Sequence, residues 1–511
     1  MKNHILSLIL AFTSLIAVAQ NPNYSEHVAP IIYDNCSGCH HAGGIAPFSL
    51  MSFNDASVYS SLISYDVSNG IMPPWPADSI DGGFVHERVL SSVEIKTIVD
   101  WVSNGTPEGN SALAPSPPAF SGNSVLGTPD IQVVAPKYTS KATSSDEYVC
   151  FTIPTSFSTD KWIEAIEVMP GNTEIVHHCL VYIDESGTYQ ADTSSGACGG
   201  PDGGILLGEY VPGSQPIVYP NDGATKFGVK LKAGAQLVLA IHYPEGSAGK
   251  LDSTKVNLHF YPDGTTGIRE VYASSIISDW AFCIDSNEVK TVASKYPATG
   301  GLLGQFSVMA FFPHMHLLGQ EISAWAITPT NDSIPLGSIS DWDFEWQGFY
   351  AYKKMKVLPV GSVIYGKAVY DNTSSNVFNP NSPPKQVCAG ANTSDEMFLI
   401  YFQYLLYQAG DENIDIDAIL DPISVLNKPL TTYDLGLSPN PVSKGGGVNI
   451  TTQSDLKSTL EVYDMKGKVV HAQKIEAVGG KLNWQNNLAS GIYFISVKNS
   501  AQRQVGKLVV Q

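Results

Sequence analysis

The sequence is poor in positive charge, and this shortage limits the kinds of partner that the protein can bind. Its 511 residues carry 29 Lys and Arg against 48 Asp and Glu, giving a formal net charge of −19. A strongly acidic surface repels phosphate backbones and anionic headgroups. We therefore expect no nucleic-acid partner and no attachment to an anionic membrane surface.

Long apolar runs are equally scarce. Beyond the N-terminus, no stretch reaches the roughly 18 consecutive apolar residues that a membrane span requires, so we expect no membrane span. Residues 1–19 combine Lys2, an apolar run over 5–18 and the tripeptide Ala17-Val18-Ala19. This pattern is typical of a secretory signal peptide. We therefore expect an exported chain, in a compartment where disulfides can form.

A helix-rich composition is also missing. The chain contains 45 Gly, 32 Pro and 24 Tyr, which favour short strands joined by many turns. Its length corresponds to about three or four domains. We expect a multidomain, mainly β protein with a small all-α domain at the N-terminus.

Cysteine is rare, yet two of the seven cysteines stand in one compact motif. Cys36-Ser37-Gly38-Cys39-His40 has the spacing of a c-type haem site, with two thiols for the vinyl groups and an imidazole for the iron. The alternatives are half of a zinc site or a disulfide loop, although no second CxxC follows. We predict a covalently bound haem c held by Cys36, Cys39 and His40.

Met72 is the predicted ligand for the opposite face of the iron. It lies in the loop Gly70–Trp75 (GIMPPW), and a thioether at this position raises the reduction potential. His41 adjoins the proximal histidine and cannot reach across, while Met51 and His86 are weaker candidates. Simple packing is the alternative role for Met72.

Residues 91–102 (SSVEIKTIVDWV) predict a helix, with a serine cap, Glu94 in the first turn and apolar residues at helical spacing. Asn104-Gly105 ends it. With CxxCH on an early helix and the MPPW loop, this layout resembles small class I cytochrome c domains over residues 21–110. A linker rich in Pro, Ser and Ala is predicted over 111–122.

Histidines at special spacings occur in the region that follows. Short apolar runs separated by turn residues predict β-sandwich domains over 123–270 and 271–432. His177 and His178 are adjacent, so in a regular strand they would face apart. Sharing a metal requires a bulge, a strand end or opposite ring nitrogens. The segment LVLAIHY then predicts a strand that ends on His242.

The segment FFPHMHLLG (311–319) holds His314 and His316. In a strand, residues two apart point the same way, so both imidazoles would project together while Met315 turns away. The alternative is a pair of ordinary histidines near a strand end. Met397 follows in the segment TSDEMF, and by itself it could equally be a core methionine.

The order of these four motifs resembles the copper type II, ascorbate-dependent monooxygenases, the peptidylglycine α-hydroxylating and dopamine β-monooxygenase family. That family has an adjacent histidine pair, a single histidine, HxH and a methionine, in this order. The resemblance implies two jelly-roll-like sandwiches facing each other across a solvent cleft. It implies two copper ions, one held by His177, His178 and His242, the other by His314, His316 and Met397.

The ligand types fit copper chemistry independently of the resemblance. Three imidazoles suit copper in either oxidation state, whereas a thioether favours Cu(I). We therefore predict that O₂ meets reduced copper at the site of His314, His316 and Met397, the predicted catalytic residues, and that the all-histidine site supplies the second electron. Four further histidines are expected to be structural: His27, His86, His259 and His471.

Five cysteines remain outside the haem motif, and an odd number leaves one unpaired. The resemblance implies a disulfide between Cys150 and Cys198, and a pair Cys283–Cys388 would close the second domain. Cys179 would then be a buried thiol beside the copper ligands. The chain has fewer cysteines than the animal enzymes, and the family's substrate-anchoring residues cannot be placed in it.

Residues 435–511 form a separate predicted unit. Period-2 segments joined by glycine turns, among them LEVYDMKGK and LASGIYF, predict a small β-sandwich. The segment resembles the C-terminal sorting domain of bacterial type IX secretion substrates. The alternative is a generic carbohydrate-binding or immunoglobulin-like module.

These features predict a secreted or surface-attached copper monooxygenase that receives electrons through its own haem. Its expected partners are O₂, an organic or peptide substrate, an external electron donor to the haem and the bacterial secretion machinery. The sequence does not name the substrate. Two other classes stay open: a non-catalytic electron-transfer or copper-binding protein, and an adhesin with vestigial sites.

Overall fold

The structure is a computed structural model of the 511-residue chain. It describes residues 21–120, 124–201, 203–424, 435–451, 456–463, 469–477, 481–498 and 503–511. The predicted signal peptide over 1–19 lies outside the described residues.

The chain divides into two compact units, which are described separately. The first comprises Met1–Trp75 and Glu87–Ala119, and the second comprises Pro76–His86 and Phe120–Gln511. Residues 76–86 thus lie within the second unit, although they fall inside the 21–110 segment of the sequence interpretation. They attach to it through Asp78, which accepts hydrogen bonds from Ser338 (2.7 Å) and Ser340 (2.6 Å).

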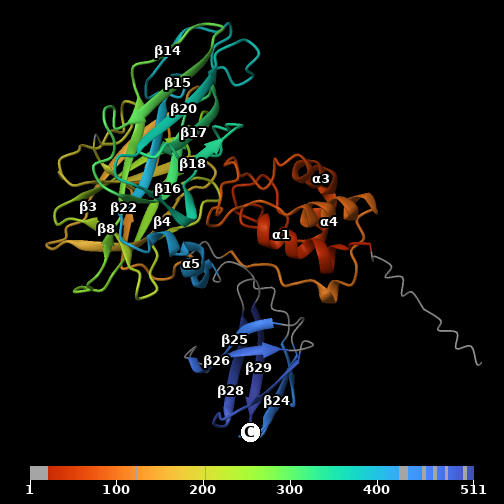
Figure 1. Ribbon diagram of the computed structural model, residues 1–511. Coiled ribbons are helices and arrows are strands. Elements are labelled where there is room, and N and C mark those ends of the chain that lie inside the picture. Colours follow the sequence, from red (N-terminus) through yellow and green to blue (C-terminus); the bar gives the residue numbers. More distant parts are fainter. Residues whose placement is uncertain are drawn as a thin grey trace, which may run out of the picture. The chain divides into compact units, whose positions relative to one another are not determined.

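The first unit is helical (red to orange in Figure 1). Its core gathers Tyr24, Val28, Ile32, Ile98 and Trp101, all nearly or fully buried. Its elements are η1 (Tyr24–Val28), α1 (Ala29–Asn35), α2 (Phe53–Val58), α3 (Ser60–Ser68), α4 (Ser92–Ser103) and η2 (Ser111–Leu113).

The helix predicted over 91–102 is confirmed. In α4, the Ser91 hydroxyl accepts the Glu94 N–H while the Glu94 carboxylate accepts the Ser91 N–H, a reciprocal capping box. The prediction that CxxCH lies on an early helix is wrong. Helix α1 ends at Asn35, and Cys36 is its C-cap residue, so the motif occupies the turns that follow.

The first β module contains two larger sheets, ordered β1-β11-β4-β8-β12, with β7 on β4, and β3-β9-β5-β6, together with the two-stranded sheet β10-β2. Strand β9 is buried at every position because it lies between β3 and β5 and both its faces are covered. The strands are β1 (Ile131–Val134), β2 (Tyr138–Thr139), β3 (Glu147–Pro154), β4 (Lys161–Met169), β5 (His178–Asp184), β6 (Ile205–Tyr210), β7 (Ile217–Val218), β8 (Phe227–Leu231), β9 (Gln236–Tyr243), β10 (Leu251–Asp252), β11 (Lys255–Phe260) and β12 (Arg269–Glu270).

The second β module has the sheets β13-β22-β16-β19 and β15-β20-β17-β18. Alternate residues of β20 are buried, as expected for a strand with one face toward the core. The elements are β13 (Tyr272–Asp279), β14 (Cys283–Ile284), β15 (Val289–Tyr296), β16 (Phe306–His314), β17 (Gly319–Ile327), β18 (Ser333–Ile339), β19 (Tyr350–Leu358), β20 (Val363–Asp371), β21 (Val387–Cys388), β22 (Phe398–Leu406), η3 (Asp411–Asn413) and α5 (Ile416–Ser424).

Residues 435–511 form strands of their own (blue in Figure 1). The sheets are β23-β24-β27 and β26-β25-β28-β29, around a core that includes Val448, Leu460, Ile495 and Leu508. The strands are β23 (Gly436–Ser438), β24 (Gly447–Thr451), β25 (Leu456–Tyr463), β26 (Val469–Ala477), β27 (Lys481–Gln485), β28 (Gly491–Lys498) and β29 (Arg503–Val510).

The described chain is thus mainly β with a small helical N-terminal region, as predicted. The finer jelly-roll and cytochrome c assignments stay predictions. Within the described residues, no helix is long and apolar enough to cross a membrane. Both expected disulfides, Cys150–Cys198 and Cys283–Cys388, are present, and Cys179 is a buried free thiol.

The two β modules share one hydrophobic core. A single cluster of buried residues runs from Val149 and Leu239 of the first module to Met309 and Met355 of the second. A hydrogen bond also joins the two modules, since Oε1 of Glu209 on β6 accepts the Phe349 N–H at 2.7 Å. Burial raises the pKa of Glu209 from the ordinary 4.5 to about 8.

This raised pKa predicts a pH-dependent loss of stability. The folded state holds the Glu209 proton more tightly than the unfolded state, so its contribution is complete below pH 4.5 and is lost as pH rises to about 8. Glu209→Gln should remove this part of the pH dependence. Urea unfolding at pH 5 and pH 8 measures it, and we expect the wild-type loss to exceed that of the variant by on the order of a few kcal/mol.

Glu174, whose side chain is largely exposed, provides the control. Glu174→Gln should leave the wild-type pH dependence unchanged. Equal pH dependence in wild type and Glu209→Gln would contradict a protonated, buried Glu209.

Candidate metal centres

Three histidines of the first module are brought together by strand pairing. His178 opens β5 and stands directly opposite His242 of β9 in the antiparallel ladder. His177 precedes the strand, and its N–H donates to the His242 carbonyl at 3.0 Å. Adjacent histidines could share a metal at a bulge, at a strand end or through opposite ring nitrogens. In this structure, His177 and His178 meet His242 at a strand end.

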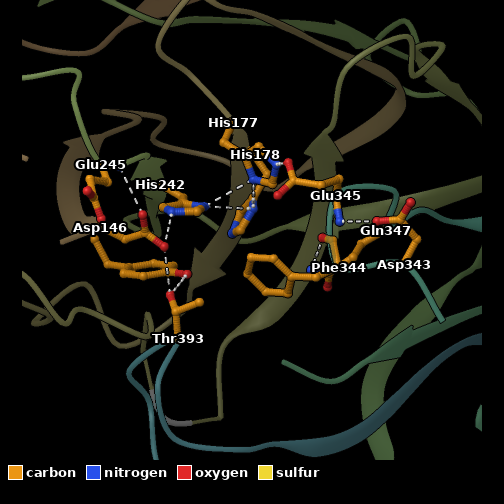
Figure 2. A network of polar contacts seen from close by, with 11 residues as sticks. Asp146, His177, His178, His242, Glu245, Asp343, Phe344, Glu345, Gln347 and Thr393 are labelled. Atoms are coloured by element: carbon orange, nitrogen blue, oxygen red, sulfur yellow. Dashed lines mark hydrogen bonds and ion pairs between the residues drawn. The ribbon is translucent and has the colours of Figure 1, made fainter. Parts of the chain in front are cut away.

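The Nδ1 atoms of these three rings face one another (Figure 2). The distances between Nδ1 atoms are 3.3 Å for His177–His178, 3.1 Å for His177–His242 and 3.4 Å for His178–His242. A three-coordinate metal with bonds of roughly 2.0 Å separates its nitrogens by about 3.5 Å. The triangle therefore has the size that a metal ion such as copper or zinc requires.

Carboxylates hold the outer nitrogens of two of these rings. His177 Nε2–H donates to Glu345 Oε2 at 2.7 Å, and His242 Nε2 faces Asp146 Oδ2 at 3.2 Å. Asp146 is itself fixed by the Thr393 hydroxyl (3.0 Å) and the Glu245 N–H (2.9 Å), as Figure 2 shows. A carboxylate on Nε2 keeps the proton there and leaves the Nδ1 lone pair free for a metal.

Burial favours the neutral, metal-binding form of these histidines. His178 and His242 are almost completely buried. Burial, followed by the neighbouring His242 and His177, holds the pKa of His178 well below its usual value, and burial also lowers the pKa of His242. The Tyr148 ring stacks on His242 at 4.3 Å between ring centroids and limits its rotation.

His314 and His316 form the second group, although not on one strand. Strand β16 ends at His314, so the strand geometry considered for 311–319 does not extend to His316. The reason is a tertiary contact, because the buried carboxylate of Glu396 accepts the N–H groups of His316 (3.0 Å) and Leu318 (2.6 Å) in place of a neighbouring strand.

The two rings of this group present the opposite nitrogen from the first group. His314 Nδ1 contacts Gln347 Oε1 at 2.5 Å, and His316 Nδ1 contacts the Asp395 carbonyl at 3.1 Å. Both partners are acceptors, so Nδ1 carries the proton and the lone pair lies on Nε2. Burial lowers the pKa of His314 to about 4 and that of His316 to about 3.

Met397 is held beside these histidines by the same carboxylate. Its N–H donates to Glu396 Oε2 at 3.2 Å, and it directly precedes β22. His314 stands opposite Leu399 in the ladder, so alternation places Met397 on the face of the sheet that carries His314. His178, His314, His316 and Met397 all line one cavity of about 840 Å³.

One segment of the second module touches both histidine groups. We call Trp342–Phe349 the bridging segment. The Phe344 ring centroid lies 6.1 Å from that of His177 and 6.0 Å from that of His316. Its other contacts are Trp342 Nε1–H to the His316 carbonyl (3.2 Å), Glu345 to His177 and Gln347 to His314.

The haem-type motif lies in the helical unit. Cys36 and Cys39 are free thiols, and His40 Nδ1 contacts the Phe48 carbonyl at 3.0 Å. This contact keeps the proton on Nδ1, and burial lowers the pKa of His40, so the Nε2 lone pair is available to iron. Met72 lies beyond α3, and its N–H donates to the Asp66 carbonyl at 3.4 Å. Its role as the second axial ligand stays a prediction.

Sequence reasoning missed the residues that orient the ligands. Asp146, Glu345 and Gln347 stand in segments without a recognisable motif, and nothing in the sequence indicates which histidine each would meet. Glu396 directly precedes Met397, so a search for carboxylates next to predicted ligands would have found this residue. Burial raises its pKa to about 8.

Two comparisons with protein families match parts of the chain. Residues 288–418 are similar to the C-terminal domain of the copper type II ascorbate-dependent monooxygenases, and this range includes His314, His316 and Met397. Residues 437–511 are similar to the secretion system C-terminal sorting domain. The first match supports a copper monooxygenase-like function. The second indicates type IX secretion to the cell surface or the extracellular space.

Comparisons over the whole chain add no relative to these two family matches. No curated protein matches the chain. Solved structures with local likeness include a Parabacteroides merdae β-glucuronidase (10% identity, 44% of this chain and 29% of that chain, TM-score 0.13) and the infectious bursal disease virus VP2 subviral particle (8%, 58% and 76%, 0.17). The chain spans under a third of the β-glucuronidase. Scores this low carry no argument about fold or function.

Glu345 gives a direct test of the first centre. Without its carboxylate, His177 loses the partner that fixes its tautomer, and such losses typically lower metal affinity by about 10- to 100-fold. We expect Glu345→Ala to show this loss in a chelator-competition titration with Cu(I). Glu345→Gln, which keeps an acceptor oxygen, should lose less.

Glu321→Ala is the matched control, because Glu321 is exposed on β17, outside both histidine groups. It should bind copper as the wild type does. Unchanged copper affinity in Glu345→Ala would show that Glu345 does not orient a metal ligand.

Proposed function

We propose that this protein is a secreted copper-dependent monooxygenase that hydroxylates a C–H bond of an organic substrate and receives electrons through its own c-type haem. The observation that carries the proposal is that two ligand groups meet at one cavity, which His178 of the first group lines together with the whole of the second group. Three converging Nδ1 atoms form one group, and His314, His316 and Met397 form the other, within the segment similar to the monooxygenase C-terminal domain.

The residues fit two copper ions of different character. His177, His178 and His242 would hold one ion, and His314, His316 and Met397 would hold the other. When bound, copper supplies one-electron redox chemistry and activates O₂ toward a C–H bond, and a thioether ligand favours the Cu(I) state that reacts with O₂. The reaction balances as R–H, O₂, two electrons and two protons giving R–OH and H₂O.

The chain's own residues prepare this chemistry in three ways. Glu345 holds the proton on the outer nitrogen of His177 through a hydrogen bond, and Asp146 lies within ion-pair distance (3.2 Å) of the outer nitrogen of His242. Glu396 fixes the backbone of His316, just after β16, and of Met397, just before β22, so one buried carboxylate positions both the imidazole and the thioether. Burial lowers the pKa of four of the imidazoles and so favours their neutral form: His178, His242, His314 and His316.

The helical unit is proposed as the electron entry. Cys36 and Cys39 would bind the haem covalently, His40 would ligate one face of the iron, and Met72 the other. When bound, a c-type haem accepts and passes single electrons. An external donor would reduce it, in place of the ascorbate that serves the animal relatives. The segment 21–110 would act as the cytochrome domain, 123–270 and 271–432 as the copper domains, and 435–511 as the address for the secretion machinery.

Met397 tests the catalytic assignment. Met397→Leu keeps the volume of the side chain and removes the sulfur, so we expect weaker Cu(I) binding at this site and loss of substrate-dependent O₂ uptake. Oxygen-electrode measurements with screened substrates, together with copper analysis, check both. Met355→Leu, which changes another buried methionine, on β19, is the control and should keep full activity.

Unchanged O₂ uptake in Met397→Leu would remove this site from the proposed reaction. Two coppers per chain without any substrate-dependent O₂ uptake in the wild type would favour the electron-transfer or copper-binding alternative.

The haem assignment has its own test. Expressed with a cytochrome c maturation system, the wild type should carry one covalent haem, measured from its pyridine haemochrome spectrum. The double variant Cys36→Ser/Cys39→Ser should carry none, because both thioether bonds are lost. Cys179→Ala, which changes the buried free thiol outside the motif, should retain the haem. A wild type without covalent haem would overturn the assignment.

A further inference from the structure

The cavity of about 840 Å³ that contains the second histidine group extends well beyond the ligands. One wall follows β5, where His178, Leu180 and Tyr182 alternate onto one face. The cavity reaches Glu185, which directly follows β5, so it extends along the length of the strand, about 20 Å.

The opposite wall is built in the same way by the second module. On β22, Leu399 and Tyr401 follow Met397 at alternate positions, and Phe312 precedes His314 by two residues on β16. The Phe312 ring lies 5.9 Å from Tyr401 between ring centroids. Along both walls, the side chains next to the proposed ligands are therefore aliphatic or aromatic.

Charged groups line only other parts of the cavity, and each already has a partner. Lys232 pairs with Glu185 at 2.6 Å, and Lys230 pairs with Asp160 at 2.8 Å. Glu270 accepts a hydrogen bond from the Tyr272 hydroxyl at 2.9 Å. Among the lining residues that the structure describes, none is an arginine.

The inner walls also offer neutral hydrogen-bonding groups. The hydroxyls of Tyr182 and Tyr401 interact with each other, and burial raises the pKa of both, so they remain uncharged phenols. A ligand carboxylate or ammonium placed between them would lose its hydration without gaining an opposite charge, which is costly. A ring would instead pack on Phe312 and Tyr401, and an uncharged polar group could bond to the phenols.

Resting on the proposed function, we propose that the substrate is a neutral, ring-bearing organic molecule, held against Leu180, Phe312 and Tyr401 with its reacting carbon toward His314, His316 and Met397. This excludes a substrate that is anchored by a terminal carboxylate, such as a peptide ending in glycine.

Binding to the copper-loaded, anaerobically reduced protein tests this class without turnover. The probes are 3-phenylpropanamide, 3-phenylpropanoate and 3-phenylpropylammonium, which share a ring and a chain and differ in charge. Hard carboxylate oxygens bind Cu(I) poorly, so the metal itself does not select the anion. Isothermal titration should show the amide binding at least about tenfold more tightly than either ion.

Leu180→Arg tests whether this wall sets the preference. Leu180 is only partly buried, and an arginine there would provide the missing cation, so we expect 3-phenylpropanoate to become the tightest of the three probes. Leu303→Arg is the control: Leu303 is 98% exposed and lies outside the cavity, so the order of the probes should not change. Thermal unfolding verifies that both variants are folded.

A second variant keeps the test decisive if Leu180→Arg does not fold. Tyr401→Ala removes a ring from the wall and should weaken binding of the amide by about tenfold. Equal or tighter binding of either ion to the wild type, or no measurable binding of any probe, would overturn the proposal, as would an unchanged amide affinity in a folded Tyr401→Ala.

These experiments distinguish a failure of the proposed substrate class from a failure of the proposed monooxygenase function. Preference for the amide without O₂ uptake for any substrate would leave a neutral-ligand site and refute the monooxygenase. O₂ uptake with a charged substrate, and tighter binding of the corresponding ion, would retain the monooxygenase and refute the substrate class.

Discussion

The convergence of three imidazole nitrogens within a buried sheet is the constraint on which the site depends. Nitrogen lone pairs 3.1–3.4 Å apart repel one another unless a proton or a metal cation lies between them. Folding nevertheless enforces this arrangement, because β5 and β9 fix His178 opposite His242, and a backbone hydrogen bond fixes His177 beside them. A metal ion held by these three nitrogens, as proposed, would offset the cost of this arrangement.

The second group depends on a different device, the buried carboxylate of Glu396. It accepts the N–H groups of His316, Leu318 and Met397, which ends β16 and begins β22 around one acceptor. The bridging segment then connects the groups, since Phe344 lies against His177 and His316 while Glu345 and Gln347 each hold a histidine. The two groups are therefore connected by a few direct contacts of one segment.

Much of this organisation can be read from local sequence. The helix cap at Ser91, the strand that carries His242 and the mainly β composition depend on neighbouring residues, and each was predictable. The end of β16 was not, because Glu396 lies 80 residues from His316. Glu345 and Asp146, the carboxylates beside His177 and His242, were missed for the same reason. The residues that contact a ligand histidine are brought there by tertiary packing, so their spacing in the sequence follows no rule.

X-ray absorption at the copper edge of the Cu(I)-loaded protein tests the central claim most directly. We expect two coppers per chain, surrounded by imidazole nitrogens, with one sulfur scatterer for every two coppers that disappears in Met397→Leu. A single copper per chain, or a spectrum without sulfur in the wild type, would contradict the two-centre arrangement.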